Sequence, residues 1–247
     1  MDLCVKDANA AFGGAEDAIL AIEYPEGDRI RSRKVISRSK ARGSGKYPSW
    51  KMGRMIHWES PHELNAFRLL DANSAVLEFA EQPLVIKYRL DGVEHEHYPD
   101  IRVTTRQGKE LWEVKTAEDA ATPEVARRTA LMSAALPTLG YVYRVVHAED
   151  LGRRPRLKTV LEVLRLGRAD IPAVERERLR VTFERAPNLT WGDVKRGALG
   201  AKGQYFACRL ILEGAIALDL TTPILDSRPL TWRGQQADFS NPAESNQ

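Results

Sequence analysis

Residues 55–151 alternate between helix and strand patterns, and this alternation constrains the fold more than any other feature of the chain. The segment Ser60-Pro61-His62-Glu63 predicts a helix start, because serine is a favoured N-cap, proline suits the first helical position and glutamate follows the cap by three residues. Apolar residues then recur at helical spacing, at Phe67 and Leu70. A second helix is expected over residues 123–135.

Short runs rich in β-branched and aromatic residues predict strands around these helices. Turn-forming pairs separate two of the strand pairs, at Asp91-Gly92 and at Gln107-Gly108. A mixed sheet with helices on both faces follows, so the fold class is α/β. The expected strands are residues 75–79, 84–89, 100–104, 110–115 and 141–146.

Charged side chains are expected to meet where these elements end. Side chains two apart on a strand share a face, so Glu113 and Lys115 should point the same way. Asp100 lies across the second turn from them, and Glu63 lies on the first helix. Converging carboxylates suit Mg²⁺, with Mn²⁺ as the alternative ion, and such an ion can polarise a phosphodiester. A neighbouring lysine can orient the attacking water.

Each of these residues also has a structural alternative. Glu63 can be only the partner of Ser60 in a capping box, and Asp100 only a residue of the turn before a strand. A Glu-x-Lys pair on a strand usually faces solvent. The combination is what indicates a site, and Glu59, one turn before Glu63, leaves open which of the two would bind the metal.

The motifs of this segment resemble the restriction-endonuclease-like nucleases, and more closely the TnsA-type endonuclease subunit of heteromeric transposases. By this resemblance, Glu63, Asp100 and Glu113 would hold Mg²⁺ together with the Val114 carbonyl, and Lys115 would be the catalytic lysine. The implied fold is a restriction-endonuclease-like core, a mixed sheet flanked by helices. The likeness rests on Ser60-Pro61-His62-Glu63, Glu81-Gln82-Pro83-Leu84, Pro99-Asp100 and Glu113-Val114-Lys115.

The resemblance also implies a function and partners. A subunit of this kind nicks double-stranded DNA at the 5′ ends of a transposon, while a DDE-type transposase subunit acts at the 3′ ends. An AAA+ ATPase regulator is a further expected partner. Two alternatives remain: a stand-alone restriction-like or repair nuclease, and a non-enzymatic DNA-binding assembly subunit whose carboxylates are structural.

Positive charge is concentrated near the N-terminus. Residues 29–58 contain ten basic residues and no acidic one, with Tyr47, Trp50 and Trp58 among them. This composition favours an extended basic arm that contacts the phosphate backbone of nucleic acid, with a solvated loop as the alternative.

Two further pairs of residues, one of arginines and one of histidines, stand out in this segment. Arg127 and Arg128 are candidates for DNA contact on the second helix, although exposed arginines are common. His95 and His97 share a strand face, but the sequence offers no third metal ligand at a recognisable spacing, so a solvated edge is favoured.

The predicted domains follow from these patterns. Residues 1–54 form an N-terminal segment with the basic arm, 55–152 the catalytic domain, 153–233 a winged-helix-like domain and 234–247 a disordered tail. The winged helix is inferred from helices followed by a strand pair, an arrangement used both in DNA binding and in protein docking.

Composition excludes several other classes. The chain has two cysteines in 247 residues, too few for a disulfide framework, and it lacks the run of roughly 18 apolar residues that a membrane span requires. The start of the sequence does not resemble a secretory signal. The expected location is the cytoplasm of a prokaryote, in association with the nucleoid.

Overall fold

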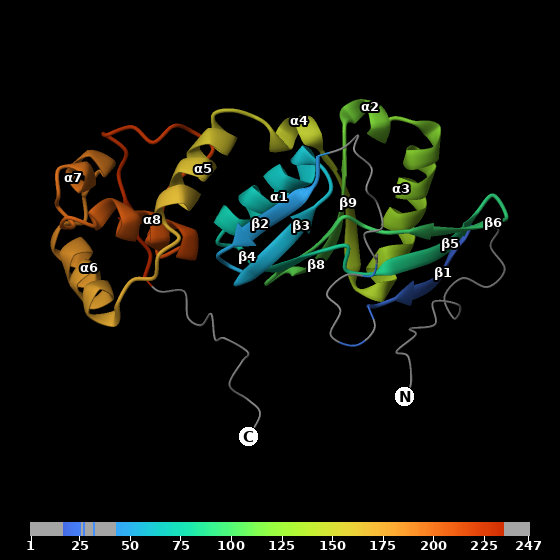
Figure 1. Cartoon of the computed structure of the whole chain (residues 1–247), viewed down its shortest axis with the longest axis horizontal. Helices are drawn as coiled ribbons and strands as arrows, with labels where there is room; N and C mark the ends of the chain where they lie inside the picture. Colours follow the sequence, from blue (N-terminus) through green and yellow to red (C-terminus); the bar gives the residue numbers. More distant parts are fainter. Residues whose placement is uncertain (1–16, 26, 28–31, 33–42, 235–247) are drawn as a thin grey trace, which may run out of the picture. The chain divides into compact units, whose positions relative to one another are not determined.

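The structure of the chain is a computed structural model that describes residues 17–25, 27, 32 and 43–234. It divides into two compact units, Met1–Arg153 and Arg154–Gln247 (Figure 1). Within the described residues, none of the helices is long and apolar enough to cross a membrane.

The first unit is built around a four-stranded sheet with the order β4-β7-β8-β9. The turn at Gln107-Gly108 connects β7 and β8 in antiparallel pairing, whereas β8 and β9 run parallel, so the sheet is mixed as the sequence predicts. With its flanking helices this sheet fits a restriction-endonuclease-like core. The strands are β4 (Val76–Glu81), β7 (Ile101–Thr105), β8 (Gly108–Lys115) and β9 (Tyr141–His147).

A second sheet has three strands in the order β1-β5-β6: β1 (Ala18–Glu23), β5 (Val85–Leu90) and β6 (Val93–His97). The predicted hairpin joins β5 to β6 through Asp91 and Gly92, whose φ angles of 55° and 73° are those of a tight two-residue turn. Strand β1 comes from the N-terminal segment, where the sequence predicted none.

Two helices cover opposite faces of the four-stranded sheet. Helix α1 (Pro61–Ala72) packs its Phe67 and Leu70 into one apolar cluster, and α3 (Pro123–Ala135) contributes Met132 and Ala135 to another. Strand β8 supplies Leu111 to the α3 cluster and Val114 to the α1 cluster, as alternation along a strand requires. The remaining helices of the unit are short: α2 (Ala117–Ala120), η2 (Leu136–Leu139) and α4 (Ala148–Leu151).

The prediction of an extended basic arm is wrong for its second half. Residues 45–58 form a hairpin of β2 (Gly45–Ser49) and β3 (Arg54–Trp58), whose Tyr47 and Ile56 are buried in the α1 cluster. The first half of the predicted arm, apart from Ser32, lies outside the described residues. The predicted tail also lies there, apart from Gly234.

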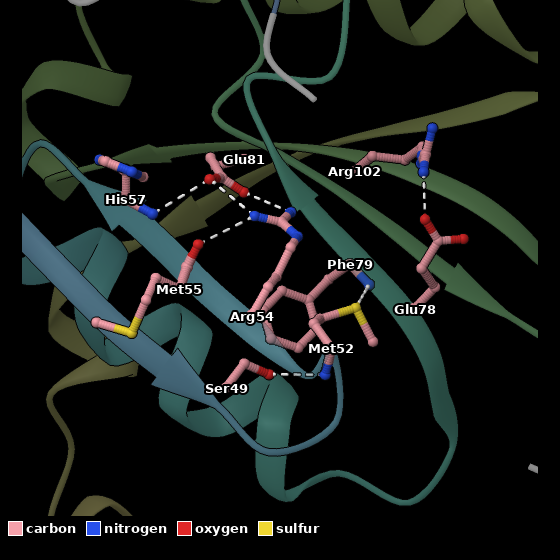
Figure 2. A network of polar contacts seen from close by, with 9 residues as sticks. All are labelled: Ser49, Met52, Arg54, Met55, His57, Glu78, Phe79, Glu81 and Arg102. Carbon is pink, nitrogen blue, oxygen red and sulfur yellow. Dashed lines mark hydrogen bonds and ion pairs between the residues drawn. The ribbon is translucent and has the colours of Figure 1, made fainter. Parts of the chain in front are cut away.

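Two carboxylates, distant from the hairpin in sequence, hold it in place. Asp71, fully buried on α1, accepts hydrogen bonds from the Tyr47 hydroxyl at 2.7 Å, from the Ser49 hydroxyl at 2.6 Å and from two backbone N–H groups at 3.2 and 3.3 Å. Glu81, at the end of β4, binds both terminal nitrogens of Arg54 and accepts the His57 N–H (Figure 2). The carboxylates of Asp71 and Glu81 therefore hold the hairpin of β2 and β3, a basic segment, against the core.

The second unit consists, within residues 154–234, of four helices and one short strand pair. The predicted helices are present, and Phe183 of α6 stacks on Trp232 with ring centroids 5.4 Å apart. The paired strands are only two residues long, so this arrangement does not show a winged helix. The elements are α5 (Arg156–Leu166), α6 (Ala173–Arg185), α7 (Trp191–Lys195), α8 (Gly203–Glu213), β10 (Ile216–Ala217) and β11 (Thr231–Trp232).

Candidate active site

Glu113 and Lys115 lie together at the end of β8, as strand alternation predicts. Glu113 is only 3% exposed, and its Oε1 lies 2.9 Å from the Lys115 ammonium nitrogen. Burial lowers the pKa of Lys115, but the charges of Glu113 and Asp100 raise it by more, so the lysine stays protonated. Val114 between them points into the apolar cluster on the other face.

Asp100 immediately precedes β7 and lies opposite Glu113, because the register pairs Ile101 with Trp112. Its Oδ2 accepts the backbone N–H of Val114 at 2.7 Å. Burial, followed by the charges of Glu113 and Glu63, raises the pKa of Asp100 well above the ordinary value. Glu113 and Glu63 are thus close enough to oppose the ionisation of Asp100.

The backbone of Asp100 is held by Gln82, the residue that follows β4. The backbone N–H of Gln82 donates to the Asp100 carbonyl oxygen at 2.8 Å. Gln82 has a φ of 43°, in the left-handed region that non-glycine residues seldom adopt. Glu81 and Gln82 therefore connect the Arg54 hairpin to the strand that presents Asp100.

Glu63 is engaged at the start of α1. Its backbone N–H donates to the Ser60 side chain at 3.1 Å, and its carboxylate accepts the Ser60 hydroxyl at 3.0 Å and the Glu59 N–H at 2.8 Å. The helix cap is therefore confirmed. Burial raises the pKa of Glu63, against the effect of these hydrogen bonds, while nearby Lys115 favours its charged form. A cap role and a ligand role are both compatible with this position.

Two predictions about nearby residues are wrong. His97 lies in the core instead of on a solvated edge: it is 6% exposed, and its Nε2 is 2.9 Å from the Tyr143 hydroxyl and 3.4 Å from Glu113 Oε2. Burial, then the positive charges of Arg128 and Lys115, lowers the pKa of His97 to about 3. This imidazole is therefore neutral at physiological pH, while His95 stacks on Tyr88.

Arg128 likewise points inward. Its guanidinium lies 3.3 Å from Glu113 Oε1, and its side chain is 13% exposed. Only Arg127 of the pair is largely exposed, where it pairs with Asp91. The sequence did carry a signal for this difference, because Arg128 shares a helix face with the buried Met132 and Ala135, at a spacing of four and seven residues.

The oxygen atoms of this cluster suit a hard divalent cation. Glu113 Oε2 is buried and accepts no hydrogen bond from the described residues, and Asp100 is near enough to Glu113 and Glu63 for their charges to raise its pKa. As the side chains stand, however, no group of three or more His, Cys, Asp or Glu in the described part of the chain is arranged to hold a metal ion. The donor chemistry fits Mg²⁺, and binding would require carboxylates to turn away from their present partners.

Comparison with known proteins identifies one family. Residues 73–161 match the family model described as TnsA-like endonuclease N terminal, which confirms the resemblance drawn from the sequence motifs. The match spans about a third of the chain, including Asp100, Glu113 and Lys115, and begins after the helix that carries Glu63. No curated protein matches the chain. Residues 73–161 are thus similar to the N-terminal domain of TnsA-like endonucleases.

Proposed function

We propose that this protein is a Mg²⁺-dependent DNA endonuclease that nicks the 5′ ends of a transposable element within a heteromeric transposase. The observation that carries the proposal is the cluster at the ends of β7 and β8, where Asp100 and Glu113 face each other beside Lys115. Buried like charges destabilise a fold, and such clusters are characteristic of sites that bind a cation or perform chemistry.

In this proposal, Glu63, Asp100 and Glu113 hold the ion together with the carbonyl of Val114, and Mn²⁺ is the alternative to Mg²⁺. When bound, such an ion would polarise the phosphodiester and lower the pKa of a water molecule. Lys115 remains protonated because of its carboxylate neighbours, so it can orient the attacking water and offset charge on the phosphate. The chain thus brings ligands and a cation together from the ends of α1, β7 and β8.

The implied partners are double-stranded DNA at the element ends, a DDE-type transposase subunit for the 3′ strands and an AAA+ ATPase regulator. The second unit would bind DNA or a partner, in the manner of a winged helix. Residues 151–233 contain sixteen basic and nine acidic residues, which favours contact with nucleic acid.

The test is cleavage of a supercoiled plasmid that carries the element ends, by full-length protein with and without its partner transposase, in Mg²⁺ or in EDTA. We expect nicking at the 5′ ends that requires Mg²⁺ and the partner, and that is lost in Lys115→Ala. Nicking without any partner would favour a stand-alone nuclease. Absence of nicking in every metal and partner combination would favour a non-enzymatic assembly subunit.

A further inference from the structure

The environment of Glu113 contains more positive charge than Lys115, the one cation among the five proposed site residues, accounts for. Its Oε1 is shared by two cations, Lys115 at 2.9 Å and Arg128 at 3.3 Å. Arg128 comes from α3, a different element from the strand ends that carry the cluster, and 87% of its side chain is shielded by the fold, as its 13% exposure shows. An arginine in such a place must be held by specific partners, because desolvating a guanidinium is costly.

The partners of Arg128 fix its position. Besides Glu113, it hydrogen-bonds the side chain of Tyr143, whose hydroxyl lies 2.9 Å from the ring nitrogen of His97. Lys115 and Arg128 are the lysine and the arginine that lie within ion-pair distance of Glu113 among the described residues. Removing Lys115 from Glu113 would therefore leave Arg128 as its counter-charge.

We infer that Arg128 is a positioning residue: it acts as the resident counter-ion of Glu113, which frees Lys115 for the water and the phosphate. The inference rests on the proposed nuclease function. In the cluster with a divalent ion bound, the three carboxylates carry three negative charges, whereas Lys115, Arg128 and the ion carry four positive charges. A DNA phosphodiester neutralises the one positive charge in excess. Without Arg128, the metal-loaded cluster has no net charge to attract the phosphate, and Lys115 is the remaining cation beside Glu113.

The variant Arg128→Gln separates this role from a merely structural one. Loss of a positive charge beside the ligands should tighten Mn²⁺ binding by roughly threefold or more, measured by titration of the full-length protein without DNA. The same variant should nick DNA about tenfold or more slowly at saturating Mg²⁺, because charge balance and the release of Lys115 are both impaired. Arg128→Lys keeps the charge, so it should bind Mn²⁺ with the affinity of the wild type and should regain part of the nicking rate.

Arg127→Gln is the matched control, since it removes the same charge one residue earlier on α3 from a side chain that is 53% exposed and pairs with Asp91. It should leave the Mn²⁺ affinity unchanged, and its nicking rate is the reference for loss of a charge from α3 without loss of the Glu113 contact. Arg128→Gln with weaker Mn²⁺ binding than wild type, or with a rate like that of Arg127→Gln, would overturn the inference. If Arg128→Gln does not fold, Arg128→Lys decides: a folded Lys variant that loses more than a hundredfold in rate contradicts a counter-ion role. A wild-type protein that neither binds Mn²⁺ nor nicks would instead refute the proposed function.

Discussion

Asp71 and Asp100, both in the first unit, differ in how the charge of the carboxylate is satisfied. Asp71, 0% exposed, is surrounded by four donors, two hydroxyls and two backbone N–H groups. Asp100 accepts the N–H of Val114 and faces two other carboxylates, which help to raise its pKa. The carboxylate of Asp71 is satisfied by hydrogen-bond donors of the protein, whereas the carboxylate of Asp100 lies near two other acidic groups.

This difference distinguishes a structural acid from a functional one. Hydrogen bonds to a charged acceptor stabilise a fold, so Asp71 repays its burial by holding the hairpin of β2 and β3 against α1. We expect the cluster around Asp100 to destabilise the same unit in the absence of a divalent cation. Clusters of acidic groups that lower the stability of a fold usually serve binding or catalysis.

The largest effect that tests the comparison is expected from Asp100→Asn. Nicking should fall by at least about a hundredfold, because a ligand charge is lost, while stability without metal should rise. The folded-state pKa of Asp100 is raised, so its contribution to stability is fully present below the unfolded pKa and is lost as the pH rises through the folded pKa. The stability advantage of the Asn variant should therefore grow with pH.

Plasmid nicking and thermal melting in EDTA from pH 5 to pH 8 measure these two effects. Active Asp100→Asn protein would remove the residue from the site. A variant that melts below wild type at every pH would show that the carboxylate is structural after all.

Asp71→Asn should give the opposite pattern. The amide keeps one acceptor oxygen but turns an NH₂ group toward donors, so we expect a loss of about 2–3 kcal/mol in the free energy of unfolding. Nicking per folded molecule should remain close to wild type. Urea unfolding, followed by a rate measurement in which folded protein is quantified, checks both parts; equal stability of variant and wild type would contradict the assigned role of Asp71.

The smallest effects concern Glu63, which combines both kinds of behaviour. Glu63→Gln can still accept one of the two hydrogen bonds at the helix start, so stability should change little, while nicking should fall about tenfold if the carboxylate is a ligand. Ser60→Ala should do the reverse, with a loss of about 1 kcal/mol in stability and a normal rate. A Gln variant with full activity would assign Glu63 to the cap alone.

Local patterns were sufficient to predict much of the central unit. Ser60 and Pro61 mark the start of α1, the turn at Asp91-Gly92 joins two strands, and Glu113 and Lys115 share a face as alternation requires. These features depend on residues that are neighbours in sequence. The hairpin of residues 45–58 could not be predicted in this way, because Asp71 and Glu81 supply its acceptors from more than 20 residues away.

Within the site, the sequence predicted the residues that belong to local motifs, and it did not predict those that packing brings beside them. Motif spacing indicated Glu63, Asp100, Glu113 and Lys115, but Arg128 and His97 were interpreted as solvent-facing. Their burial depends on how α3 and β6 pack around Glu113, which no local spacing specifies. The predicted Val114 carbonyl ligand and the choice of metal stay predictions.

The two ends of α1 are linked by the geometry of the helix itself. Asp71 is eight residues after Glu63, which corresponds to about 12 Å along the axis at roughly 1.5 Å per residue. A rod of that length that pivots by about 5° at Asp71 moves Glu63 by about 1 Å, and a displacement of that size can reduce a reaction rate by about a hundredfold. Asp71→Asn keeps one acceptor oxygen against the hairpin, so we expect the variant to hold Glu63 within that distance and to retain its rate.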